Sequence, residues 1–220
     1  RLPRAAIHVI PNGIELERFD QPQFSTCRTE LRRSLGFDPQ DQLVLVPAVL
    51  REGKGHERLI QAAPALRARV PAVRILFAGG GPRERALRLQ AQSADGAIIF
   101  LGPRQDIPEL LAACDLVVLV SDAEALPTAL IEAAAAGRPV VATRVGGAAE
   151  VVEHGRTGWL VPPDDPVALV EAMANLLNDR RRARAFGATA RQLAYERFSI
   201  DLQLERTLAL WSEVVRGAQR

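Results

Sequence analysis

The sequence has few of the residues that bind metals or cross-link small proteins. Among 220 residues there are two cysteines and three histidines. Cys27 and Cys114 share no motif, so we expect neither a disulfide framework nor a zinc site. Cys114 lies within the apolar run LLAACDLVV and is expected to be a small buried side chain.

Long apolar runs and a strong net charge are also absent. No run approaches the roughly 18 residues of a membrane span, and a net charge of +2 is a weak signal for nucleic-acid binding. The first residues, RLPRAAIHVI, include no initiator methionine and lack the layout of a signal peptide. We therefore expect a piece of a longer protein in the cytoplasm or at the cytoplasmic face of the membrane, with no transmembrane segment and no nucleic-acid partner.

Lysine is nearly absent, because Lys54 is the only one in the chain. The other basic residues are arginines, which indicates a bias in composition. We accordingly interpret the arginine cluster at residues 180–184 as a solvated helix face. A bias toward arginine leaves the single lysine unexplained.

Apolar segments with the character of buried strands recur along the chain. Their alternation with helical patterns predicts an α/β fold with a doubly wound, parallel, six-stranded Rossmann-like sheet and helices on both faces. A further strand pattern at residues 5–10 ends at a Pro-Asn-Gly turn. The six predicted sheet strands cover residues 43–50, 73–78, 97–101, 116–120, 139–143 and 158–161.

Helical patterns fill the intervals between these strands. Pro64 should kink or interrupt the first helix after the strand at 43–50. Asp106 and Asp165 suit N-cap positions, and Pro166 suits a first helical turn. The predicted helices cover residues 27–35, 59–70, 83–93, 106–113, 127–136, 165–177, 180–195 and 200–216.

Residues 121–147, SDAEALPTALIEAAAAGRPVVATRVGG, join a buried strand to a helix and then to another strand. Such corners of an open α/β sheet face the crevice where ligands bind. Glu124 lies in the loop and Glu132 one to two turns into the helix, while Pro127 and Thr128 begin that helix, whose free N–H groups attract anions. The two carboxylates would accept hydrogen bonds from the hydroxyls of a sugar or ribose. Alternatively, they are a solvated loop residue and a helix-capping residue.

The segment REGKG at residues 51–55 follows the strand at 43–50. Glycines allow close backbone approach, and Arg51 and Lys54 could bind phosphates. The segment matches neither a P-loop nor a dinucleotide fingerprint, and a basic surface turn is the alternative. We expect His56 to be a surface or helix-cap residue. The glycines at 79–81 favour a tight turn, and Gly146-Gly147 fits either packing or approach to a ligand.

An ordered set of motifs resembles the C-terminal half of the family 4 (group 1) glycosyltransferases over about residues 7–200. The motifs are VIPNGIELERF, REGKGHERLIQAA, ILFAGGGP, IIFLGPRQDIPELLAACDLVVLVS, EALPTALIEAAAAGRPVVATRVGGAAEVV and GRTGWLVPPDDPVALVEAM. The family signature, two glutamates separated by seven residues, corresponds to Glu124 and Glu132.

The resemblance implies one half of a GT-B fold, in which two Rossmann-like domains face each other across a cleft. It implies a hexosyltransferase-type enzyme that uses a nucleoside-diphosphate sugar, retains the anomeric configuration and needs no metal or other cofactor. Lys54 and Glu124 would be catalytic: Lys54 holds the diphosphate and Glu124 contacts the donor sugar. Glu132 would contact the ribose, and the loop 102–104 the nucleobase. The implied donor-binding residues are Arg51, Gly53, Arg104, Leu126, Pro127, Thr128 and Glu132.

Two positions depart from the family pattern. The arginine usually found five residues before the lysine is Val49 here, so Arg51 is the candidate substitute. The glycine that commonly follows the first glutamate is Ala125. The added methyl group would narrow the approach of the donor sugar.

The resemblance also predicts the domain organisation. Residues 1–20 would be the end of an N-terminal acceptor-binding domain and the linker, residues 21–198 the nucleotide-sugar-binding domain, and residues 199–220 a helix that returns toward the N-terminal domain. The apolar stripe of this helix should then be exposed, and the chain should be inactive alone. The stripe comprises Ile200, Leu204, Leu208, Trp211 and Val215.

Two further functions fit the same residues. The first is a nucleotide-sugar epimerase or a phosphorylase with the same architecture. The second is a non-catalytic nucleotide-binding module. Formation of a product without an acceptor would indicate the first, and binding without the two glutamates and Lys54 would indicate the second. The acceptor itself could be a glycan, a lipid or a small molecule.

Overall fold

The computed structural model describes residues 7–20, 23–94 and 96–218. Its centre is a six-stranded sheet in the order β3-β2-β1-β4-β5-β6, and every neighbouring pair is parallel. This is the doubly wound order, with a switch point between β1 and β4. The strands are β1 (Gln42–Pro47), β2 (Val73–Ala78), β3 (Ile98–Gly102), β4 (Leu116–Leu119), β5 (Val140–Thr143) and β6 (Gly158–Val161).

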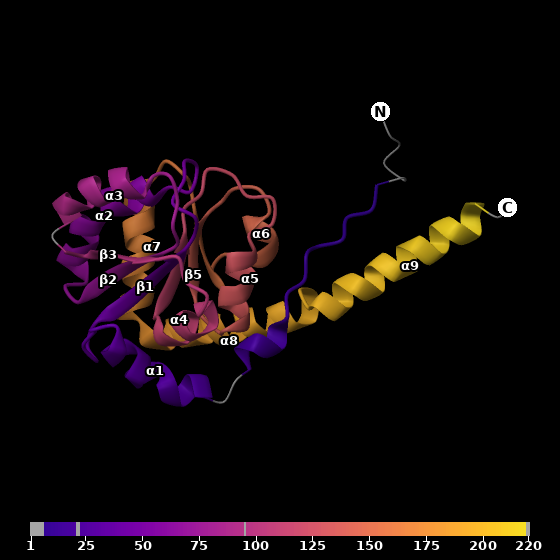
Figure 1. Cartoon of the computed structure of the whole chain (residues 1–220), viewed down its shortest axis with the longest axis horizontal. Helices are drawn as coiled ribbons and strands as arrows, with labels where there is room; N and C mark the ends of the chain where they lie inside the picture. Colours follow the sequence, from indigo (N-terminus) through magenta and orange to yellow (C-terminus); the bar gives the residue numbers. More distant parts are fainter. Residues whose placement is uncertain (1–6, 21–22, 95, 219–220) are drawn as a thin grey trace.

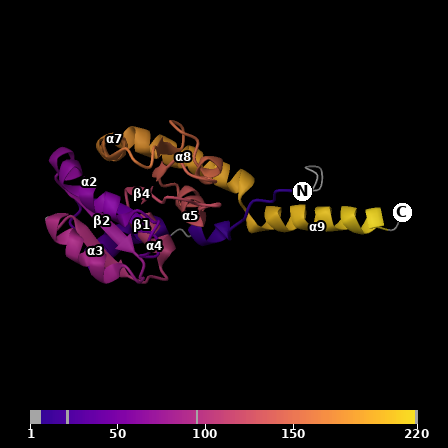
Figure 2. The same ribbon diagram turned by 90° about the horizontal axis from the view of Figure 1, so that it is seen from above.

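Helices lie on both faces of the sheet (Figures 1 and 2). They are η2 (Leu16–Phe19), α1 (Gln23–Ser34), α2 (His56–Arg69), α3 (Glu84–Gln90), η3 (Ala91–Ala94), α4 (Ile107–Ala113), α5 (Thr128–Ala135), α6 (Ala148–Val151), α7 (Pro166–Asn178), α8 (Arg180–Arg197) and α9 (Ile200–Ala218). The predicted doubly wound architecture is confirmed, because helices fill the intervals between parallel strands.

The alternation of side chains along the strands divides the core into two layers. In β1, Val44 and Val46 pack with α2 and α7, whereas Leu43 and Leu45 pack with α4 and α5. All four side chains are fully buried or nearly so. A strand covered on both faces explains why its sequence is a continuous apolar run.

Several local predictions are corrected by the structure. Residues 7–10 form no strand, and residues 5–6 lie outside the described part. Helix α1 begins at Gln23, before the predicted start at Cys27. Helix α2 continues through Pro64 without interruption. Pro64 removes one amide donor at an exposed position, while the packing of the apolar face maintains the helix on both sides.

The two predicted caps differ in the structure. The Asp165 carboxylate accepts a hydrogen bond from the Ala168 amide at 2.8 Å, which confirms it as the cap of α7. Asp106 occupies the N-cap position of α4 but makes no side-chain cap bond. Its two oxygens instead accept hydrogen bonds from the Arg104 guanidinium, at 2.8 and 2.5 Å. Paired charge-assisted bonds are stronger than one bond to a neutral amide.

Helix α9 extends away from the rest of the chain (Figures 1 and 2). The predicted stripe is exposed, from 42% at Ile200 to 66% at Trp211. The start of α9 is joined to the N-terminal segment, because the Ile14 amide donates to the Phe198 carbonyl and the Ile14 carbonyl accepts from the Ile200 amide. Within the described residues, no helix combines the length and the apolar character that a membrane span needs.

Candidate functional site

A cavity of about 630 Å³ lies at the carboxyl ends of β1, β4 and β5. This is the edge of the sheet where open α/β proteins bind ligands. Three loops contribute to the cavity, one after each of these strands. Its lining residues are Arg51, Asp122, Ala123, Glu124, Ala125, Val145 and Gly146.

Lys54 and Glu124 meet at this edge of the sheet. The Lys54 ammonium lies 2.6 Å from one carboxylate oxygen of Glu124, and the side chains are only 16% and 12% exposed. The same oxygen accepts a hydrogen bond from the Ser121 hydroxyl at 2.6 Å. The structure therefore brings together the two residues to which the resemblance assigns catalytic roles.

Close backbone contacts fix the three loops against one another. The Asp122 amide donates to the Gly53 carbonyl at 2.8 Å. A Cβ atom at Gly55 would lie 2.0 Å from the Val120 carbonyl oxygen, and one at Gly146 would lie 1.7 Å from that of Glu124. Only glycine fits such contacts. Of the two interpretations of Gly146-Gly147, the packing role is therefore supported.

The glycines at 79–81 also serve packing. A Cβ atom at Gly79 would lie 2.1 Å from the Ala48 carbonyl oxygen, and one at Gly81 would lie 2.4 Å from that of Leu50. The turn after β2 therefore lies directly against the loop after β1. This agrees with the interpretation of the segment as a tight turn.

Two supporting residues carry no distinct signal in the sequence. The Ser121 side chain bonds Glu124, and the Ser121 carbonyl accepts from the Thr143 hydroxyl at 2.6 Å. The Arg58 guanidinium donates to the Val120 carbonyl at 2.9 Å and lies 2.5 Å from the Asp122 carboxylate. Arg58 could not be distinguished from the other arginines by sequence, and its helix brings it under the loop that carries Glu124.

Glu132 lies one turn into α5, whose first residue is Thr128 and whose N-cap position is Pro127. Its side chain is partly buried, and this burial raises the pKa of its carboxyl group, while the charge of Arg18 acts in the opposite direction. Glu132 is not among the residues that line the cavity. Leu126, which precedes Pro127, packs against the core.

The predicted arginines differ in their surroundings. Arg51 lines the cavity, and its guanidinium donates to the neighbouring Glu52 carbonyl at 3.0 Å. Arg104 pairs with Asp106, and this hydrogen bonding raises the pKa of Arg104 and lowers that of Asp106. Val49, which occupies the position where the family usually has an arginine, is 53% exposed.

His56 is fully buried, and Gly55 rather than His56 is the N-cap of α2, so the predicted surface or helix-cap position is wrong. It begins α2 and packs edge-on against Phe77, with ring centroids 4.8 Å apart. In the described part of the chain, neither ring nitrogen has a hydrogen-bond partner. Burial lowers the pKa of His56 to about 4, so the ring is neutral near pH 7.

Comparison with known proteins identifies relatives over most of the chain. The family model described as "Glycosyl transferases group 1" matches residues 28–193. A GDP-mannose-dependent alpha-(1-6)-phosphatidylinositol monomannoside mannosyltransferase from Mycolicibacterium smegmatis is 35% identical over 205 residues, covering 88% of this chain and 53% of the relative. The chain spans about half the length of the curated relatives that it matches.

Solved structures show the same fold. The Anabaena protein HepE, crystallised with UDP and glucose, superposes with a TM-score of 0.81 at 30% identity, covering 93% of this chain and 56% of HepE. The isolated C-terminal domain of a group 1 glycosyl transferase from Francisella tularensis superposes with a TM-score of 0.73 at 22% identity. That match covers 86% of this chain and 100% of the other. The chain thus has the Rossmann-like fold that forms one half of a GT-B protein.

Proposed function

The chain belongs to the glycosyl transferases group 1 family, and we propose that it is the donor-binding part of a retaining enzyme that transfers a sugar from a nucleoside-diphosphate sugar to an acceptor. The observation that carries this proposal is the contact of Lys54 with Glu124 beside the 630 Å³ cavity. The printed names of relatives support such a donor, because one mannosyltransferase is GDP-mannose-dependent and HepE was crystallised with UDP and glucose.

In this proposal, Lys54 and Glu124 exchange their mutual contact for contacts with the donor. The Lys54 ammonium binds the diphosphate and offsets the negative charge that develops as the nucleoside diphosphate departs. This residue, rather than a metal ion, supplies the positive charge. The Glu124 carboxylate, released from Lys54, accepts hydrogen bonds from the donor sugar hydroxyls, and Ser121 keeps it oriented.

Helix α5 supplies the remaining contacts with the nucleotide. The exposed amides at its start, near Thr128, face the phosphates with the positive end of the helix dipole. Glu132, one turn further, accepts hydrogen bonds from the ribose hydroxyls. The partial burial of the Glu132 carboxylate has a desolvation cost that hydrogen bonds from two hydroxyl donors would offset. Arg51 lines the cavity and would contact the phosphates, and Arg104 would lie near the nucleobase.

We further propose that transfer needs a second domain, which binds the acceptor. The relatives are about twice as long as this chain, and α9 presents an exposed apolar stripe that this chain does not cover in its described part. Leu204, Leu208 and Trp211 on that stripe are 50–66% exposed. Contiguous apolar surface of this kind marks a contact with another protein surface.

Calorimetric titration tests the donor site directly. UDP-glucose, UDP-N-acetylglucosamine and GDP-mannose are titrated into the wild type, Glu132→Ala and the control Glu171→Ala. Glu171 is an exposed glutamate on α7 and does not line the cavity. We expect saturable binding of at least one donor, at least tenfold weaker in Glu132→Ala and unchanged in Glu171→Ala. Failure of all three donors to bind, or equal affinities in the wild type and Glu132→Ala, would overturn the assignment.

The two other functions predict different results. An epimerase would form an epimer of the sugar, and a phosphorylase would form a sugar phosphate when inorganic phosphate is supplied, in both cases without a glycan, lipid or small-molecule acceptor. A non-catalytic module would still bind the nucleotide after replacement of Lys54, Glu124 and Glu132 by alanine. No observation in the structure favours either of them over sugar transfer.

A further inference from the structure

A second cavity, of about 960 Å³, lies at the opposite edge of the sheet from the proposed donor site. Its lining includes Gln42 at the start of β1, Asp115 just before β4 and Pro139 just before β5, together with residues of α1 and α8. The six residues of β1 separate the two edges by about 20 Å. The volume is at the upper end of the range for small-molecule sites, about 300–1,000 Å³.

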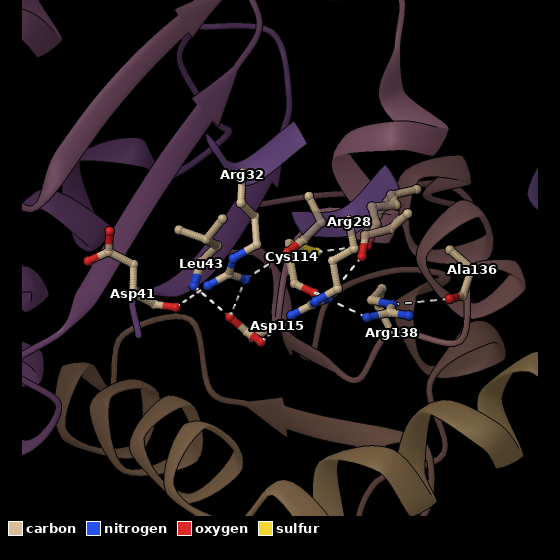
Figure 3. A network of polar contacts seen from close by, with 11 residues as sticks. Arg28, Arg32, Asp41, Leu43, Cys114, Asp115, Ala136 and Arg138 are labelled. Atoms are coloured by element: carbon tan, nitrogen blue, oxygen red, sulfur yellow. Dashed lines mark hydrogen bonds and ion pairs between the residues drawn. The ribbon is translucent and has the colours of Figure 1, made fainter. Parts of the chain in front are cut away.

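Three arginines of this cavity converge on the C-terminal end of α4 (Figure 3). Arg28 donates to the carbonyls of Ala112 and Cys114 at 2.8 and 2.9 Å, and Arg32 donates to the Ala113 carbonyl at 2.9 Å. Arg138 donates to the Cys114 carbonyl at 3.2 Å and, through Nε, to the Ala136 carbonyl at 3.1 Å. These bonds satisfy carbonyls that the end of a helix leaves free.

The cluster has more positive charge than its surroundings neutralise. Asp115 is paired with both Arg28, at 2.6 Å, and Arg32, at 3.3 Å. Within the described residues, Arg138 has no carboxylate at ion-pair distance. Three guanidinium groups therefore share one carboxylate and the partial negative charge of a helix end, which is about half a charge.

Three other carboxylates line the cavity: the Asp38 side chain is exposed, and those of Asp41 and Asp20 already have partners. Asp41 pairs with Arg74 at 3.3 Å and accepts a bond from the Asp38 amide. Asp20 pairs with Arg191 and accepts a bond from the Tyr195 hydroxyl at 2.5 Å. Burial also lowers the pKa of Arg138, as expected for a cation without a counter-ion. An anion from outside the chain would supply the missing charge.

Further arginines stand at the rim of the same cavity. They are Arg33 on α1 and Arg180 and Arg184 on α8, all exposed. In the part of the chain that the structure describes, none of these three forms an ion pair. The cluster at 180–184, interpreted from sequence as a solvated face, thus partly faces a concave surface.

We propose that this cavity is a second binding site, which takes a small molecule bearing a phosphate group and holds that group at Arg138. A guanidinium presents paired N–H donors that match two phosphate oxygens. Arg28 and Arg138 lie on the inner side, and Arg180 and Arg184 complete the site from α8. This inference is independent of the proposed sugar transfer, because it uses neither Lys54 nor the two glutamates.

Pyrophosphate and inorganic phosphate are the probes, titrated calorimetrically at constant ionic strength. All proteins carry Lys54→Ala, which weakens binding of the probe at the proposed donor site. We expect saturable binding of at least one probe, about tenfold weaker after Arg138→Gln and unchanged after Arg182→Gln. Arg182 is an exposed arginine on α8 that pairs with Asp179 and does not line the cavity.

Arg138 also bonds carbonyls of the chain, so a second variant protects the test from a folding defect. The double variant Arg180→Gln/Arg184→Gln changes only exposed rim residues, and we expect it to weaken binding about threefold while thermal unfolding stays at the wild-type temperature. The proposal is overturned if neither probe binds saturably, or if the variants at 138, 180 and 184 bind as tightly as Arg182→Gln.

Discussion

Lys54 and Glu124 are 70 residues apart in the sequence, yet their charged groups lie 2.6 Å apart at the carboxyl edge of the sheet. The chain's single lysine therefore pairs with the first glutamate of the signature. Both side chains are mostly shielded from water, so their interaction is stronger than that of a surface ion pair. A diphosphate that binds the Lys54 ammonium would free the Glu124 carboxylate to bind the sugar.

Lys54→Ala should weaken binding of a nucleoside diphosphate while leaving that of the nucleoside unchanged. A hydrogen bond to a charged group contributes about 1.5–3 kcal/mol, which is roughly a tenfold to hundredfold change in affinity. Calorimetry with UDP and GDP, compared with uridine and guanosine, measures the effect. An unchanged diphosphate affinity would remove Lys54 from the site.

Glu132→Gln should have opposite effects on stability and on binding. Because burial raises the pKa of the Glu132 carboxyl group, its ionised form is destabilising near pH 7. The neutral amide should therefore increase the free energy of unfolding at pH 7, measured with urea. The same variant should bind the donor at least tenfold more weakly, since the amide accepts fewer hydrogen bonds. Loss of stability together with unchanged binding would indicate a structural role.

Gly146→Ala should destabilise the chain much more than Gly36→Ala. Both glycines have positive φ, at +44° and +78°, which costs a non-glycine residue about 1–2 kcal/mol. A Cβ atom at Gly146 would also collide with the Glu124 carbonyl. A Cβ atom at Gly36 would have no neighbour within 4 Å beyond the adjoining residues, in the described part of the chain. We expect a loss of about 3 kcal/mol or more for Gly146→Ala and about 1 kcal/mol for Gly36→Ala in urea unfolding. Equal losses would show that the loops are not packed as described.

His56 should make stability fall between pH 6.5 and pH 4. Its pKa is lowered to about 4 by burial, so in this window the unfolded chain binds a proton that the folded chain does not. Stability is then fully present above pH 6.5, and up to about 3 kcal/mol is lost as the pH falls to 4. Urea unfolding of His56→Leu should show a flatter profile, whereas the exposed His8→Gln should keep the wild-type slope. A wild-type slope in His56→Leu would contradict this account.

The sheet could be predicted from sequence because its strands are buried on both faces. A short continuous apolar run such as the one at residues 43–50 has few structural interpretations other than a buried strand. Residues 7–10 have a similar local pattern, but no strand within the described residues pairs with them. Pairing is not encoded in a short segment. Pro64 is a local signal that favours interruption of a helix, and here the packing of α2 overrides that signal.

The meeting of Lys54 and Glu124 could also be anticipated, because each follows a parallel strand and such strands end at one edge. Their supporting residues could not be anticipated. Arg58 cannot be told from any other arginine in an arginine-rich chain, and the same holds for Arg138 in the second cavity. The role of each depends on which carbonyls the fold brings near it. Asp106 was expected to cap a helix, and its carboxylate instead binds Arg104.

A crystal structure of the chain with the tightest-binding nucleoside-diphosphate sugar tests the central claim most directly. The account predicts the sugar and diphosphate in the 630 Å³ cavity, with phosphate oxygens within hydrogen-bond distance of the Lys54 ammonium and the ribose beside Glu132. It also predicts that Lys54 and Glu124 no longer contact each other. A ligand bound elsewhere, or one in the cavity with the Lys54–Glu124 contact intact, would contradict it.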